Sequence, residues 1–254
     1  MPLRFHEYLG AEEQNLLASV LNFRTELDLF GQLDDIFQSP IARLRIPEED
    51  EAGLLVGQLY LFVHFHLYFS VSCLLRSHLS ESFSSTRKAI DASLTAYKII
   101  LEPETASRYI QRDRYFQFIK ASLQNEIKKN SSKYPLAHIL IKLHDSCSEY
   151  GSHADISSFV HRIEMNELPG ANADLLQVHY FQFPRDSTEY KFYFVLTLQA
   201  FLQAFRIFKA FFNKRLKIID PGWEASIGKL NALLEQLRQQ HYAAIDASQK
   251  AADS

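Results

Sequence analysis

The longest apolar stretch of the chain lies between residues 54 and 75 and reads LLVGQLYLFVHFHLYFSVSCLL, without one Asp, Glu, Lys or Arg. A helix of this composition is apolar on all sides, which is typical of a core helix or a membrane span. Pro47 and the acidic residues 48–51 favour a helix start just before it, because proline suits the first turn and acids stabilise a helix N-terminus.

A second apolar helix is predicted from Ser187 to Lys217. Its apolar side chains fall on two faces, which indicates burial on more than one side. One face comprises Phe194, Leu198, Phe201, Phe205, Phe208 and Phe212, and the other comprises Tyr193, Ala200, Ile207 and Phe211.

Shorter amphipathic patterns predict further helices, bounded by proline, glycine and N-cap signals. They cover about 11–37, 80–101, 103–129 and 135–151, and a last helix begins near Trp223. In the first of them, Leu16, Val20 and Phe23 belong to the apolar face. Helices starting near 80, 134 and 187 are expected to surround the 54–75 helix.

The segments SSFVHRIEM and LLQVHYFQF flank a turn at residues 169–172 and predict a small β-hairpin near 157–183. The expected fold is therefore mainly α, an up-and-down helical bundle around two very apolar central helices. We expect residues 1–46 to form an N-terminal helix and linker packed on the bundle, 47–246 to form the bundle domain, and 247–254 to be a disordered tail.

Polar residues within the two apolar stretches bear on the membrane alternative. The first contains two histidines, a glutamine and two serines, and the second carries Arg206 and Lys209. These residues favour a protein core over a bilayer. The N-terminus shows no signal-peptide pattern, so we expect a cytoplasmic protein that does not bind membranes.

Composition narrows the function classes. A net charge of −3 argues against a protein that coats nucleic acid with its whole surface. The basic residues between 108 and 129 form either a solvated helix face or a local nucleic-acid surface. Cys73 and Cys147 lack CxxC spacing and are expected to be small core side chains in a reducing compartment.

Arg87 and Asp91 are the polar residues least expected in their surroundings. Arg87 shares a helix face with Phe83, Ile90 and Leu94, and Asp91 follows it by one turn. A buried guanidinium needs a partner, so an Arg87–Asp91 ion pair is predicted. This pair either fixes helix register or provides an arginine for anion binding or catalysis.

Several other polar residues are candidates for a site. Ser148 and His153 lie at a helix end, where they are either capping and loop residues or a pair facing Arg87. His64 and His66 point in different directions on a helix, so they cannot share one metal, and one of them is expected to line a cleft. The sequence offers no metal set and no cofactor motif.

The segments TRKAIDASLTAYKIILEPE (Thr86–Glu104) and SEYGSHAD (Ser148–Asp155) resemble helical bacterial proteins related to the HEPN superfamily. The resemblance implies a helical bundle, a homodimer and a role near RNA, nucleotides or defence systems. Active ribonucleases of that superfamily carry Arg, four to six residues and then His on one helix. No Arg and His of this chain have that spacing.

Two functions are therefore expected to compete. The first is a helical interaction or ligand-sensing protein without a catalytic motif, acting as a homodimer. The second is a metal-independent ribonuclease or nucleotide-processing enzyme, with Arg87 neutralising phosphate charge, Asp91 beside it and His153 as the general acid or base.

Overall fold

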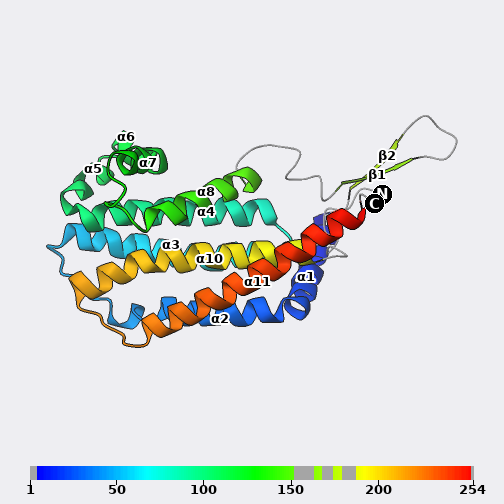
Figure 1. Cartoon of the computed structure of the whole chain (residues 1–254), viewed down its shortest axis with the longest axis horizontal. Helices are drawn as coiled ribbons and strands as arrows, with labels where there is room; N and C mark the ends of the chain where they lie inside the picture. The colour runs from blue at the N-terminus through cyan, green and yellow to red at the C-terminus, as the bar shows by residue number, and fades with distance from the viewer. Residues whose placement is uncertain (1–4, 152–162, 168–173, 179–186, 253–254) are drawn as a thin grey trace.

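The structure, a computed structural model, describes residues 5–151, 163–167, 174–178 and 187–252 (Figure 1). Long helices make up most of it, so the prediction of a mainly α bundle is confirmed. The principal helices are α1 (Phe5–Asn22), α2 (Arg24–Gln38), α3 (Glu51–Leu75), α4 (Leu79–Leu101), α8 (Ala137–Gly151), α10 (Thr188–Phe211) and α11 (Trp223–Ala252).

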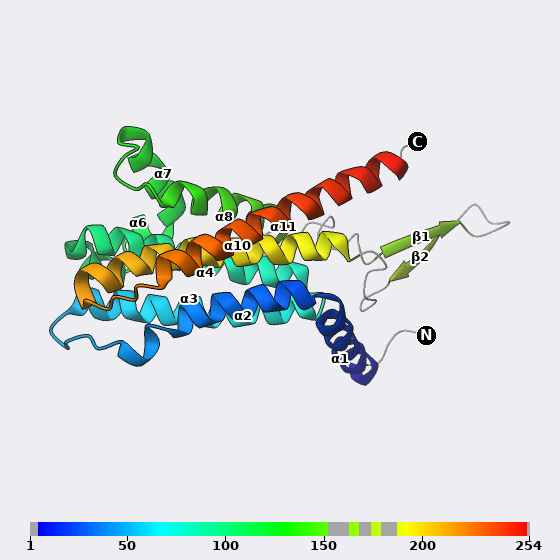
Figure 2. The ribbon, with the colours of Figure 1, turned by 60° about the horizontal axis from the view of Figure 1, so that its bottom comes forward.

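Helix α10 is the centre of the bundle. It packs against α2, α3, α4, α8 and α11, and it runs alongside them in both views (Figures 1 and 2). The side chains of Phe194, Leu198, Phe201 and Phe205 are at most 1% exposed. Both apolar faces predicted for this helix are buried, because it has neighbours on every side.

Helix α3 is covered on one side only. Tyr60, Val63 and Leu67 are fully buried, whereas Phe62 and Phe65 are 43% and 60% exposed. Its main partners are α4 and α10, and α8 packs on α4 instead. The prediction that helices surround this stretch is therefore wrong, since no element of the described chain covers its outer side.

The start of α3 differs slightly from the prediction. Residues 47–50 form a turn, and the helix begins at Glu51 with Asp50 as N-cap. The Asp50 side chain accepts a hydrogen bond from the Gly53 backbone N–H at 2.8 Å. It also accepts one from Arg215 Nε at 2.7 Å, and this ion pair lowers the Asp50 pKa. The segment between α10 and α11 thus contacts and stabilises the start of α3.

The predicted helix over 11–37 is in fact two helices, because the backbone departs from helical geometry at Phe23. Phe23 is buried against Phe194, and α1 leaves the bundle at a steep angle to α2 (Figure 2). Val20 was expected in the core but is 43% exposed. An apolar period continues through such a bend, so the pattern cannot reveal it.

The single helix predicted over 103–129 is divided into η2 (Pro103–Thr105), α5 (Ala106–Ile110), α6 (Arg114–Gln117) and α7 (Ile119–Lys129). The first break follows from a left-handed backbone at Arg112, where φ is 57°. Asp113 then caps α6 by accepting from the Tyr115 backbone N–H at 2.7 Å. These breaks fold the segment back over α4.

Four short elements and the tail complete the description. Two of them are short helices, the 3-10 helix η1 (Ile41–Arg43) and the π-helix η3 (Phe212–Leu216). The strands β1 (Ile163–Glu167) and β2 (Asp174–Val178) pair antiparallel, while the rest of the predicted 157–183 excursion lies outside the described residues. Helix α11 extends to Ala252, into the stretch predicted to be disordered.

Both apolar helices are long and apolar enough to cross a membrane, judged by length and composition alone. Core helices of water-soluble proteins have the same properties. In this structure 61% of the most apolar part of α3 is buried, against 83% for α10 with its π-helical extension. The two helices thus differ in how completely protein covers them.

Candidate functional site

Arg87 and Asp91 meet at a histidine that no sequence pattern of the chain indicates as a site residue. His144, from α8, lies with Nε2 3.2 Å from Arg87 Nε and 3.3 Å from Asp91 Oδ1. No direct ion pair joins Arg87 to Asp91 within the described chain. The predicted pair is wrong because α8 packs on α4 and places an imidazole between the two side chains.

One ring nitrogen of His144 faces both charged groups. The Arg87 N–H donates to Nε2, which must then be unprotonated, with the proton on Nδ1. Nδ1 lies 3.3 Å from Ser148 Oγ, which can accept that proton in a hydrogen bond. Contact between Nε2–H and Asp91 requires the other tautomer or the imidazolium. His144 Nε2 therefore accepts a hydrogen bond from Arg87 when it is unprotonated, and donates one to Asp91 when it is protonated.

The cluster is not sealed from solvent. His144 is 5% exposed, but the Asp91 side chain is 39% exposed and Arg87 is half-buried. Asp91 also lines a groove of about 460 Å³ between α3, α4 and the α5–α7 segment. The carboxylate therefore has one side toward His144 and another toward an open groove.

The other residues considered as neighbours of Arg87 differ in where they lie. Ser148 lies on α8 one turn after His144 and donates to its backbone carbonyl at 2.8 Å. Cys147 is buried as predicted, and burial raises its pKa to about 12, with Arg87 acting in the opposite direction. His153 lies outside the described residues.

His64 and His66 are both buried and both hydrogen-bonded, and they point to different helices. His64 Nε2 lies 3.1 Å from Asp34 Oδ1 on α2, and its ring stacks on Phe37. His66 Nδ1 lies 2.7 Å from Ser85 Oγ on α4, and burial, followed by the charge of Lys88, lowers its pKa. Neither of them lines the groove beside Asp91.

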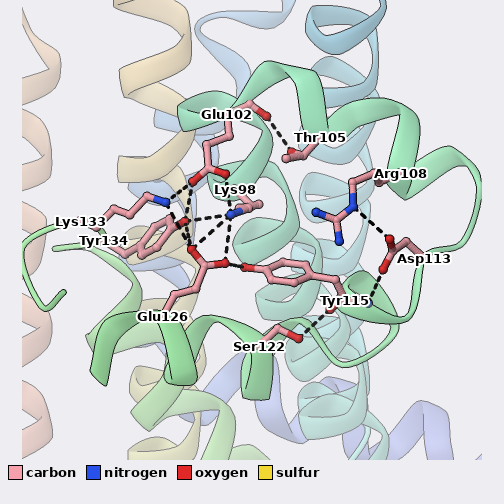
Figure 3. A network of polar contacts seen from close by, with 10 residues as sticks. All are labelled: Lys98, Glu102, Thr105, Arg108, Asp113, Tyr115, Ser122, Glu126, Lys133 and Tyr134. Carbon is pink, nitrogen blue, oxygen red and sulfur yellow. Dashed lines mark hydrogen bonds and ion pairs between the residues drawn. The ribbon is translucent and has the colours of Figure 1, made fainter. Parts of the chain in front are cut away.

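A further polar cluster lies at the other end of α4, around Lys98 (Figure 3). Lys98 is 4% exposed, and its Nζ lies 2.7 Å from Glu102 Oε2 and 3.0 Å from Glu126 Oε1. The Tyr134 hydroxyl lies 3.1 Å from the same Nζ and 2.7 Å from Glu126 Oε2. Lys133 reaches both carboxylates from the solvent side.

Electrostatics keep this cluster charged. Burial acts to raise the pKa of Glu126, but hydrogen bonds from Tyr115, Tyr134 and Lys98 outweigh it and lower the pKa to about 2. Burial and the adjacent carboxylates raise the pKa values of both tyrosines. Every polar group has a partner, so the cluster fastens α7 and the residues before α8 to α4.

The basic residues of the 103–129 segment do not form one uniform surface. Arg108 Nε donates to Asp113 Oδ2 at 2.9 Å, and Lys120 contacts Asp145. Local carboxylates thus neutralise part of the positive charge that made a nucleic-acid surface conceivable.

The outer side of α3 carries a row of exposed aromatic and aliphatic side chains, called here the α3 outer face. Its members are Leu61 (46% exposed), Phe62 (43%), Phe65 (60%), Tyr68 (39%) and Phe69 (47%). They recur at helical spacing, so they form one continuous surface. Contiguous exposed apolar surfaces of this kind mark interaction sites.

Sequence reasoning missed His144 and Lys98 for different reasons. His144 follows Leu143 in an amphipathic helix, where a histidine is unremarkable until α4 is packed beside it. Lys98 is adjacent to Tyr97 and Ile99, and this was the available signal, since a lysine between buried positions needs a carboxylate partner. One partner, Glu102, follows Lys98 by a single turn, whereas Glu126 and Tyr134 are distant in sequence.

Among the described residues, no group of three His, Cys, Asp or Glu side chains is arranged to hold a metal ion. Comparisons of the chain with protein-family models, with curated proteins and with solved structures found no match.

Proposed function

We propose that this protein is a helical interaction module without a catalytic role, and that it works as a homodimer through the α3 outer face. The observation that carries the proposal is the exposure of Phe62, Phe65 and Phe69 on the most apolar helix of the chain. Large exposed aromatic side chains are enriched at the centres of protein interfaces.

The size of the α3 outer face supports this role. At roughly 200 Å² for a large side chain, the exposed fractions of its members amount to about 470 Å². A standard interface buries about 800 Å² on each partner, with an apolar centre and a polar rim. The α3 outer face has the extent of such a centre.

Its composition supports a second copy as the partner. Residues 54–75 contain no Asp, Glu, Lys or Arg, so two such faces can meet without burying an unpaired charge. A two-fold interface brings the same surface of each subunit together, which requires a self-complementary face. An uncharged aromatic row satisfies that requirement.

Sedimentation equilibrium over a range of concentrations tests the proposal. Wild-type protein is expected to be a dimer, and Phe65→Glu is expected to be monomeric, because a carboxylate would face the apolar centre. Ile139→Glu is the matched control, since Ile139 is 44% exposed on α8 and should leave the dimer intact.

Monomeric wild-type protein at every concentration would overturn the proposal. So would a Phe65→Glu variant that dimerises as tightly as wild type. Circular dichroism of all three proteins should show the same helical content, which separates loss of association from loss of folding.

A further inference from the structure

The groove beside Asp91 has the size and lining of a small-molecule site. Its volume of about 460 Å³ falls within the range of ligand pockets, roughly 300–1,000 Å³. Leu59 and Phe62 of α3, with Tyr109 and Phe116 of the α5–α6 segment, give it a largely apolar and aromatic floor. An apolar body of moderate size fits such a floor.

The rim of the groove presents two opposite charges on one helix. Lys88 and Asp91 are three residues apart on α4, where side chains are neighbours, roughly 5–6 Å between Cβ atoms. They nevertheless form no ion pair with each other within 4.0 Å. Lys88 makes no hydrogen bond or ion pair with any residue that the structure describes, and Asp91 pairs only with His144.

Two neutral groups of the rim add hydrogen-bonding capacity. Gln58 is exposed beside the groove and has no side-chain hydrogen bond to a described residue. Gln117 also lines the groove, and its side-chain amide N–H donates to the Arg112 carbonyl at 2.9 Å. The rim therefore offers one cation, one anion and amide oxygens and nitrogens.

We propose that this groove binds a free α-amino acid with a large apolar side chain. The Lys88 ammonium would bind the α-carboxylate, and the Asp91 carboxylate would accept hydrogen bonds from the α-ammonium group. The apolar side chain would lie among Phe62, Tyr109 and Phe116. Adjacent opposite charges above an apolar floor complement this zwitterion at each of its parts.

The charges of the rim also argue against a phosphate ligand. A phosphate group requires several cations or free backbone N–H groups. Here the single unpaired lysine stands next to a carboxylate, which repels an anion. His144 does not line the groove, and its Nε2 lies 3.3 Å from Asp91 Oδ1.

Isothermal titration of the full-length protein with L-phenylalanine, L-tryptophan and L-leucine tests the proposal. At least one of them is expected to bind in the millimolar range or tighter, and glycine is expected not to bind. N-acetyl-phenylalanine and phenylalanine amide each lose one charge and are expected to bind roughly tenfold more weakly or worse.

Variants assign the two charges. Lys88→Met should weaken L-phenylalanine binding about tenfold but leave the binding of phenylalanine amide unchanged, because the amide lacks the carboxylate. Asp91→Asn should likewise weaken L-phenylalanine binding about tenfold but leave the binding of N-acetyl-phenylalanine unchanged, because that derivative lacks the ammonium group. Lys128→Met is the matched control, because Lys128 is an exposed lysine on α7 outside the groove. Thermal unfolding should confirm that all three variants fold.

The proposal would be overturned by the absence of binding for all three amino acids up to about 10 mM. Equal binding of the blocked derivatives, or binding of inorganic phosphate in preference to amino acids, would overturn it as well. Lys88 and Asp91 are not members of the α3 outer face, but Phe62 belongs to both surfaces. The titrations are therefore repeated on the Phe65→Glu variant, which separates ligand binding from dimer formation.

Discussion

Helices α3 and α10 have similar compositions but occupy different places in the molecule. Both are long and rich in phenylalanine and leucine, and they pack against each other. Helix α10 has neighbours on all sides, whereas α3 buries Tyr60 and Leu67 and exposes Phe62 and Phe65. Similar apolar composition therefore gives a filled core in α10 and an exposed apolar face in α3.

The difference arises from the number of packing partners. A helix that is apolar around its whole circumference needs neighbours around its whole circumference. The bundle supplies them to α10 but leaves one side of α3 without cover from the described chain. Leaving the α3 outer face in contact with water costs free energy relative to burying it. The proposed dimer would recover this free energy by covering the face with a second copy of the chain.

Truncating one phenylalanine in each helix gives the largest expected contrast. Phe205 is fully buried, with its ring 5.2 Å from Phe37 and 5.5 Å from Trp223. Phe205→Ala is expected to lower the free energy of unfolding by about 3–5 kcal/mol through lost contacts and a cavity. Phe65→Ala, at a position 60% exposed, should lower it by less than about 1 kcal/mol.

Urea unfolding at low protein concentration, where dimers contribute least, measures both effects. Losses of similar size in the two variants would contradict the contrast between the helices, and would mean that the outer side of α3 is packed within the single chain.

The buried lysine of α4 gives the second largest expected contrast. Lys98→Ala would leave Glu102 and Glu126 facing each other without their buried cation, at an expected loss of about 2–3 kcal/mol. Lys133 contacts the same carboxylates, but its side chain is 41% exposed. Lys133→Ala should therefore cost less than about 1 kcal/mol.

Chemical denaturation of the two lysine variants separates these expectations. Equal losses would show that burial does not distinguish the two cations. A stable Lys98→Ala protein would mean that the aromatic core alone holds α7 against α4.

The smallest expected contrast is between the two sides of α3. Tyr60 is fully buried and donates a hydrogen bond to the Phe37 carbonyl, so Tyr60→Phe should cost about 1 kcal/mol by leaving that carbonyl unpaired. Tyr68, 39% exposed, donates to Asp34 Oδ1 at 2.7 Å in reach of water. Tyr68→Phe should change stability by less than about 0.5 kcal/mol.

Both tyrosine variants keep the ring, so differences in their urea midpoints report the hydroxyl groups alone. A Tyr68→Phe variant that loses as much as Tyr60→Phe would show that water cannot replace the Tyr68 hydrogen bond.

Part of the site was predictable from the chain and part was not. Arg87 and Asp91 lie among apolar residues on one face of a predicted helix, which indicated a polar cluster on α4. The structure has such a cluster there. Their partner, His144, is distant in sequence, and no local pattern connects it to α4. The groove beside Asp91 likewise depends on the bends that fold residues 103–129 over α4.

The sequence by itself determined the helical class, the approximate extent of α4 and α10, and the burial of Cys73 and Cys147. Periodicity and proline positions encode these features locally. Only the tertiary structure decided where α1 turns away at Phe23, which charged groups meet around Lys98, and which side of α3 stays open. The physical reason is that the composition of a helix determines how much apolar surface it has. How much of that surface is buried depends on other helices, which are distant in sequence.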